Sequence, residues 1–198
     1  MPRPRSHSRD TLIVASMQRF WTHGYHATSM DDLVKATGVS RGSIYADFEG
    51  KRDLFLCCLS RYQDEVVTPA FAQVEQADAG LETIEAYLLF QLSHLDDDRL
   101  PGPGCLVANT MTELGPHDRD IHDAVNAHNV RLQNGFYQVL KRANKSTSPL
   151  SPDQLGELAV FLTMSVQGLW SFSRSAESVE PLRQYARTLV DLVKSRLR

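Results

Sequence analysis

The sequence predicts an all-α protein in two parts: a three-helix, helix-turn-helix domain at residues 1–50 and a bundle of about six helices at residues 51–198. Two observations predict this fold. Apolar residues recur at spacings of three and four, and no segment of strand length alternates apolar and polar residues between turn signals. Breaks rich in glycine, proline and serine then divide the chain into segments of helix length.

The first predicted helix spans residues 11–23. Its apolar side chains fall on one helical face, and Gly24 provides the stop. That face consists of Ile13, Met17, Phe20 and Trp21.

Two short helices follow, with only a tight turn between them. Ser29 is the expected N-cap of the first, with Asp32 as an acidic form of the capping box, and Gly38 ends the helix. Ser40 is the expected N-cap of the second, which extends to about residue 48. Two short helices joined in this way form a helix-turn-helix motif.

The remaining segments predict the bundle. They span residues 51–74, 81–95, 105–114, 119–143, 154–174 and 179–197. The last two are long and are apolar on more than a narrow stripe, which suits a four-helix interface between two copies of the chain. In that interface Gly168 would let two helices approach closely.

The composition is that of a globular protein with reduced thiols. The 198 residues are 42% hydrophobic and 23% charged, and the three cysteines do not form a disulfide framework. No apolar run approaches the roughly 20 residues that cross a bilayer, and the N-terminus lacks the apolar core of a secretory signal. We therefore expect a cytoplasmic protein without membrane contact.

Charge is distributed unevenly along the chain. Residues 1–55 carry eight Lys and Arg against six Asp and Glu, whereas residues 56–198 carry thirteen against eighteen. A basic N-terminal part on an acidic body indicates that a polyanion would meet the N-terminal part.

The start of each short helix offers groups that suit nucleic acid. Ser29 and Ser40 present hydroxyls and free backbone N–H groups to phosphate oxygens. Arg41 has the reach to bind a guanine edge or a phosphate. Gly42 has no side chain, so its helix can approach DNA closely.

Three further side chains extend this face. Ser43 suits a base or a phosphate, and the Tyr45 hydroxyl suits a phosphate. Lys51 begins the next helix, whose dipole also attracts phosphate. Ile44 and Phe48 are expected in the core. A purely structural helical pair would not need the polar residues, so the sequence favours a helix in the major groove of DNA.

The segment FWTHGYHATSMDDLVKATGVSRGSIYADFEGKRDLF closely resembles the DNA-binding domain of the TetR/AcrR family of bacterial transcriptional regulators. The likeness covers residues 9–56 and includes G-Y-x-x-T-S, A-x-x-G-V-S-x-G-x-I-Y and F-x-x-K-x-x-L-F. Ala46 and Asp47 depart from the aromatic residue and the histidine that often follow the tyrosine, which leaves the operator sequence open. The resemblance implies DNA contacts at Thr28, Ser29, Arg41, Ser43, Tyr45 and Lys51.

The resemblance also implies a mode of action. It indicates a homodimer, formed through the last two helices, that represses transcription from a near-palindromic, double-stranded DNA operator. An unknown small molecule or electrophile would release it. The alternative is an all-helical enzyme or small-molecule carrier with a structural N-terminal bundle. DNA affinity that falls steeply with salt separates the two hypotheses.

A ligand pocket is expected between the helices of the bundle. Aromatic residues and methionines at helical spacing are more common in cores than in pockets, so the candidates define a region only. The candidate lining is Phe90, Cys105, Leu106, Met111, Phe136, Phe161, Met164 and Trp170.

Cys105 follows the helix-breaking residues PGPG and is expected in the first turn of a helix. The helix dipole there lowers a thiol pKa, which favours reaction with oxidants and electrophiles. The stretch G-C-L-x-x-N-x-x-x-E, ending at Glu113, resembles one in a subgroup of the family that includes responders to electrophiles. The alternative is that Cys105 is a small buried apolar residue.

Other features are interpreted as structural. His117, His122 and His128 stand at spacings that diverge on a helix, so no metal site or cofactor is expected. GVSRG matches the nucleophile elbow of hydrolases, but a charged amphipathic helix precedes it in place of a buried strand. Arg3 and Arg5 belong either to an arm that enters a minor groove or to a solvated tail.

Overall fold

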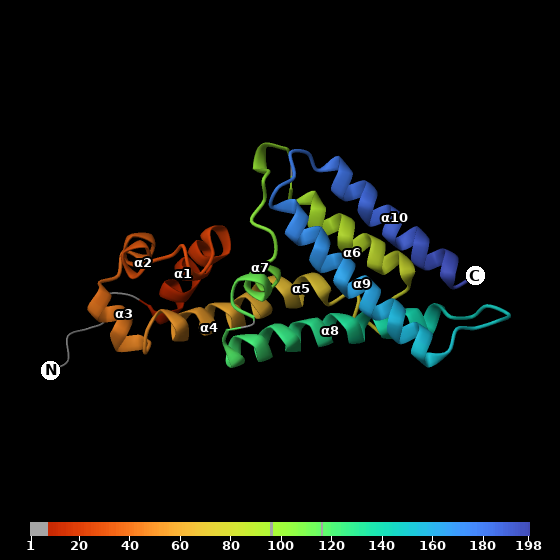
Figure 1. Ribbon diagram of the computed structural model, residues 1–198, viewed down its shortest axis with the longest axis horizontal. Coiled ribbons are helices and arrows are strands. Elements are labelled where there is room, and N and C mark those ends of the chain that lie inside the picture. The colour runs from red at the N-terminus through yellow and green to blue at the C-terminus, as the bar shows by residue number, and fades with distance from the viewer. Residues whose placement is uncertain (1–7, 96, 116) are drawn as a thin grey trace. The chain divides into compact units, whose positions relative to one another are not determined.

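A computed structural model describes residues 8–95, 97–115 and 117–198. Every regular element in that part of the chain is helical, which confirms the all-α prediction (Figure 1). Arg3 and Arg5 lie outside the described residues. The α-helices are α1 (Arg9–His23), α2 (Met30–Thr37), α3 (Arg41–Asp47), α4 (Lys51–Tyr62), α5 (Thr68–Phe71), α6 (Leu81–Ser93), α7 (Leu106–Glu113), α8 (Arg119–Ala143), α9 (Pro152–Ser173) and α10 (Glu180–Arg196).

The chain forms two compact units. Of the described residues, the first unit contains those up to Val67 together with those in Leu106–Val125, and the second contains those in Thr68–Cys105 and Asn126–Arg198. Helix α7 belongs to the first unit because it packs against α1 and α4. The predicted boundary after residue 50 divides the chain by function and stays a prediction.

The first unit is built around a small aromatic core. Phe20 of α1 packs edge-on against Phe55 of α4, with ring centroids 4.9 Å apart, and both side chains are fully buried. Ile44 of α3 and Phe48, the residue after α3, are buried as predicted; α3 packs against α2, and the Arg9 guanidinium of α1 lies 4.8 Å from the centre of the Phe48 ring. Apolar packing therefore fixes the inward faces of α1, α2 and α3.

The helix predicted over residues 51–74 differs in the structure. It ends at Phe71, and a π-helical turn at Gln63–Val67 separates α4 from α5. Pro69 has no N–H, so the carbonyl of Glu65 lacks its regular helical partner. The π turn adapts the backbone to this missing hydrogen bond.

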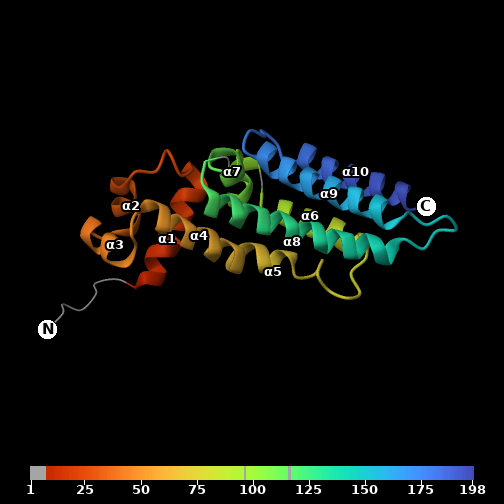
Figure 2. The ribbon, with the colours of Figure 1, turned by 60° about the horizontal axis from the view of Figure 1, so that its bottom comes forward.

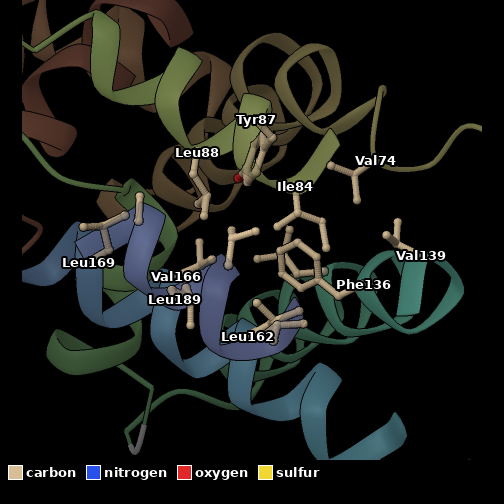
Figure 3. Packing of buried hydrophobic residues seen from close by; sticks show 14 of the residues in the cluster. Val74, Ile84, Tyr87, Leu88, Phe136, Val139, Leu162, Val166, Leu169 and Leu189 are labelled. Carbon is tan, nitrogen blue, oxygen red and sulfur yellow. The ribbon is translucent and has the colours of Figure 1, made fainter. Parts of the chain in front are cut away.

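The second unit is a helical bundle with one apolar core. Figures 1 and 2 show α10 alongside α6 and α9. Ile84 of α6, Phe136 of α8 and Leu162 of α9 lie in the interior between these helices (Figure 3). Helix α8 passes close to α5 at Gly135. A Cβ built on Gly135 would lie 2.6 Å from the Phe71 ring. Glycine is therefore required at this crossing.

Helix α9 is the one described helix whose length and composition would allow it to cross a membrane. In the structure it packs against α10, and 44% of its apolar window is buried within the protein. Its buried residues include Gln167, which donates from Nε2 to Asn129 Oδ1 over 2.9 Å. These contacts are those of a core helix in a bundle.

His128 of α8 is predicted to make the stability of the fold depend on pH. The side chain is 5% exposed, and burial, aided by the nearby Arg131 charge, lowers its pKa from 6.5 to about 4. In the unfolded chain the His128 imidazole therefore binds a proton below about pH 6.5, whereas in the folded chain it binds one only below about pH 4. The free energy of unfolding should fall on acidification through this window, by up to about 1.4 kcal/mol per pH unit.

Urea denaturation at a series of pH values measures this dependence. His128→Gln should flatten the slope between about pH 6.5 and pH 5. His122→Gln, at an exposed position of the same helix, is the control and should keep the slope of the unaltered protein. A His128→Gln slope equal to that of the unaltered protein contradicts the account.

Candidate DNA-binding surface

Helices α2 and α3 are joined by a turn that the local sequence dictates (Figure 2). Gly38 has φ 68°, in the left-handed region that favours glycine, and its N–H donates to the Val34 carbonyl over 2.9 Å. The Val39 N–H donates to Thr37 Oγ1 over 3.2 Å, and the buried Val39 side chain anchors the turn. The two helices therefore form the predicted helix-turn-helix.

Both predicted N-caps are confirmed. Ser29 Oγ accepts from the Asp32 N–H over 3.1 Å, while Asp32 accepts from the Ser29 N–H, which completes the capping box. The hydrogen bonds that the Ser29 hydroxyl and the Ser29 N–H donate to the Asp32 carboxylate lower the pKa of Asp32. Ser40 Oγ accepts from the Ser43 N–H over 3.2 Å and lies 2.9 Å from Ser43 Oγ. The three serine hydroxyls thus already have partners within the helix starts, and Ser29 and Ser40 remain exposed.

The outward face of α3 is exposed to solvent. Tyr45 is 51% exposed. Gly42 is exposed, and a Cβ built there would meet nothing within 4 Å. Within the described part of the chain no neighbour therefore requires glycine at this position, whereas close approach of an external molecule would.

Arg41 makes an ion pair that the sequence analysis missed. Its Nη2 lies 2.7 Å from Asp31 Oδ1 on α2, and both side chains are more than half exposed. An exposed pair of this kind contributes little to stability, so the guanidinium is available for exchange onto another anion. Asp47, the last residue of α3, is only partly exposed.

Two predicted contact residues point inward. Thr28 is fully buried, and its Oγ1 donates to the Gly24 carbonyl over 2.7 Å. Lys51 Nζ donates to the carbonyls of Tyr25 and Thr28, each over 3.0 Å, and lies 4.1 Å from the centre of the Tyr25 ring. Partial burial lowers the pKa of Lys51. In this structure both side chains hold the bend between α1 and α2.

Glu113, the last residue of α7, makes a long-range contact that the sequence analysis also missed. Its carboxylate accepts from the backbone N–H groups of Tyr25 and His26, over 2.9 and 2.6 Å. One signal was present in the sequence: an acidic residue at the end of a helix is unfavourable to the helix dipole and needs a compensating donor.

Arg52, next to Lys51 in α4, anchors the start of α8. Its Nη2 donates to Asp118 Oδ1 over 2.7 Å and to Asp120 Oδ2 over 2.6 Å. Hydrogen bonding to Arg52 lowers the pKa of Asp118 to about 2. The ion pair between Arg52 and Asp118 keeps both side chains charged throughout the physiological pH range.

The candidate pocket residues do not share one environment. Phe136 and Leu106 are buried, Met111 and Trp170 are partly buried, and Cys105 is 7% exposed. In contrast, the outward-facing Phe90, Phe161 and Met164 are 58%, 43% and 70% exposed. Helical periodicity identified the apolar positions but could not show which of them turn away from the bundle. The second unit has a cavity of about 640 Å³, lined by residues 77–82, Lys141–Ala143 and Lys145. None of the candidate pocket residues lines this cavity.

The three thiols are sheltered to different degrees. Cys58 is fully buried, and burial raises its pKa. Cys57 is partly exposed, and burial raises its pKa as well. Helix α7 begins at Leu106, so Cys105 immediately precedes the helix and is not in its first turn as predicted.

The other sequence patterns fall in ordinary structural settings. Ser40 of GVSRG caps α3 in a helix-turn-helix, which is not the strand-to-helix turn of a hydrolase. His117 and His122 are exposed whereas His128 is buried. Over the described ranges no three His, Cys, Asp or Glu side chains are grouped as metal ligands.

Two family models match the chain. The model for bacterial regulatory proteins of the tetR family matches residues 12–58. The model for a tetracyclin repressor-like C-terminal domain matches residues 80–189. The first covers the helix-turn-helix and the second covers most of the bundle.

Curated relatives match over nearly their whole length. The HTH-type transcriptional repressor ComR of Escherichia coli strain K12 is 31% identical over 191 residues, which span 96% of this chain and 90% of ComR. The uncharacterized HTH-type transcriptional regulator YezE of Bacillus subtilis strain 168 is 25% identical over 184 residues, which span 91% of this chain and 94% of YezE.

Solved structures share the fold. A cysteine mutant of the TetR family transcriptional regulator CifR, in complex with a 26-base-pair operator, superposes with a TM-score of 0.81 and 24% identity, covering 96% of this chain and 98% of CifR. The reduced form of E. coli NemR superposes with a TM-score of 0.71 and 19% identity, covering 91% of this chain and 94% of NemR.

The exposures of the thiols predict an order of alkylation. N-ethylmaleimide should modify Cys57 first, because Cys58 and Cys105 are buried. Peptide mass spectrometry over a time course measures the three rates, and the chain unfolded in guanidinium, where the thiols should react alike, is the control. Modification of Cys105 at least as fast as that of Cys57 would contradict its packing and support a sensing thiol.

Proposed function

The chain belongs to the TetR family of bacterial transcriptional regulators, and from this premise we propose that it is a homodimeric repressor that a small-molecule effector releases from a near-palindromic operator. The observation that carries the proposal is the outward face of α3. Arg41, Gly42 and Tyr45 are exposed there, while Ile44 alone of the helix is buried. A helix with a single buried residue and an exposed glycine contributes little to the core, and its exposed face is suited to contact with an external partner.

The DNA contacts follow from the chemistry of this face. Arg41 exchanges its exposed partner Asp31 for a guanine edge or a phosphate, which brings a stronger and more specific interaction. The Tyr45 hydroxyl donates to a phosphate, and Gly42 lets the backbone approach. The exposed starts of α2 and α3, at Ser29 and Ser40, add dipoles that favour phosphate.

Dimerisation is proposed through α9 and α10. Large apolar side chains stand exposed on both helices at helical spacing: Phe161, Met164 and Phe172 on α9, and Tyr185 and Leu192 on α10. An exposed apolar face of this extent is costly in water and typical of an interface. Gly168 lies within the α9 stripe, and a Cβ there would meet nothing within 4 Å, which leaves room for a second helix.

We propose that an effector releases the dimer from DNA by changing the spacing of its two heads, the helix-turn-helix domains (residues 1–50) of the two copies. Recognition helices of a dimer enter successive major grooves about 34 Å apart, so a small change in their separation abolishes simultaneous binding. The burial of Cys105 favours a non-covalent effector over an electrophile that must reach the thiol. An effector that binds one arrangement more tightly shifts the equilibrium toward that arrangement.

The alternative, a helical enzyme or carrier with a structural head, accounts less well for the exposed face of α3. The known relatives carry regulator names, and ComR is named a repressor. Action on chromosomal DNA implies a cytoplasmic protein, which we include in the proposal.

Substitutions on α3 test the DNA contacts. Arg41→Ala should weaken binding to the tightest genomic fragment by about tenfold or more, and Tyr45→Phe by severalfold, in fluorescence anisotropy titrations. The affinity of the unaltered protein should fall steeply with salt. Lys145→Ala removes the same charge from an exposed site between α8 and α9 and should change little. If the Arg41 and Tyr45 variants match this control, the proposed contacts are wrong.

A charge in the exposed stripe tests the dimer. Met164→Asp should shift the chain from dimer to monomer in sedimentation equilibrium, with a dissociation constant raised about a hundredfold or more, because a carboxylate would be buried without a partner. Asn134→Asp adds the same charge at an exposed site on α8 and should leave the dimer intact. A monomeric unaltered protein, or a Met164→Asp variant that still dimerises normally, contradicts this interface.

A further inference from the structure

The bend between α1 and α2, residues 24–29, is held by two side chains from distant parts of the first unit. We call this segment the α1–α2 corner. Glu113 of α7 accepts from the N–H groups of Tyr25 and His26, over 2.9 and 2.6 Å. Lys51 of α4 donates to the carbonyls of Tyr25 and Thr28, each over 3.0 Å. The Glu113 carboxylate thus binds backbone N–H groups of the corner, and the Lys51 ammonium binds its carbonyl groups.

The position of Glu113 is electrostatically unusual. It is the last residue of α7, where the negative end of the helix dipole opposes a carboxylate. Two charge-assisted hydrogen bonds from the corner, and the nearby Lys51 ammonium, offset that cost. A carboxylate at the last position of a helix destabilises that helix. The favourable interactions of Glu113 are therefore those with the α1–α2 corner.

Gly24 makes room for this carboxylate. Its φ is 85°, and a Cβ built on it would lie 3.0 Å from Glu113 Oε2. Any larger residue would both strain the backbone and press on the carboxylate. Backbone conformation and side-chain contact therefore specify the same arrangement.

The corner sets the placement of the helices that follow it. Ser29, its last residue, is the N-cap of α2, and α2 carries α3 through the short turn at Gly38. We propose that Glu113 is a positioning residue for DNA reading: by holding the N–H groups of Tyr25 and His26 it fixes the corner, and through the corner the orientation of α3. This inference rests on the proposed DNA-binding function and adds to it a residue that lies outside the head segment 1–50.

Amide hydrogen exchange and DNA binding, measured on the same variants of the full chain, test the proposal. Glu113→Ala should speed exchange of the Tyr25 and His26 amides by about tenfold or more and leave the α9 and α10 amides unchanged. The same variant should weaken binding to the tightest genomic fragment by about tenfold, while binding to random-sequence DNA is preserved, because phosphate attraction does not need an oriented α3.

Two further variants separate positioning from general stability and charge. Glu113→Gln keeps one acceptor oxygen at nearly the same size and should partly restore both the exchange protection and the specificity ratio; it also serves if Glu113→Ala does not fold. Asp123→Ala removes a carboxylate from an exposed site in the same unit and should leave both readouts unchanged.

The outcomes are distinct. Unchanged exchange at Tyr25 and His26 shows that the contact is absent in solution and overturns the proposal. Faster exchange with an unchanged ratio of specific to random binding shows that the corner does not orient α3 and overturns it as well. If the unaltered protein prefers no DNA sequence, the proposed function fails and the positioning role falls with it, while the exchange data still establish whether Glu113 holds the corner.

Discussion

The recognition helix cannot hold its own position, and the rest of the first unit compensates for this. Helix α3 has seven residues, of which only Ile44 is buried, and isolated helices of that length are not stable in water. Its placement depends on the Gly38 turn, on Phe48 in the core and on the corner held by Glu113 and Lys51. Because these supports lie behind α3, its outward face stays free for DNA.

The chain path ties these supports to the second unit. The Gly102 N–H donates to the Ser173 carbonyl at the end of α9, and Gly104 fits tightly there, since a Cβ would lie 3.0 Å from the Trp170 carbonyl oxygen. Helix α7 starts at the next residue but one and ends at the corner contact. Residues 102–105 are therefore packed against the end of α9 immediately before the chain enters α7.

The sequence predicted what local rules determine. Ser29, Ser40 and Gly38 gave the short helices and their turn, because capping and left-handed glycine depend on a few neighbouring residues. The contact of Glu113 with Tyr25 spans 88 residues and arises only from tertiary packing. The inward orientation of Lys51 and the outward orientation of Met164 were missed for the same reason: periodicity places residues on faces but not against particular partners.

Selection of bound fragments from the source genome, followed by sequencing, tests the central claim most directly, because it requires no prior operator. If paired heads read DNA, the enriched fragments should share a two-fold-related motif whose half-site centres lie about one helical turn, 34 Å, apart. Arg41→Ala should lose that enrichment. Recovery of fragments without a common motif, at the level expected for random phosphate attraction, would contradict the account.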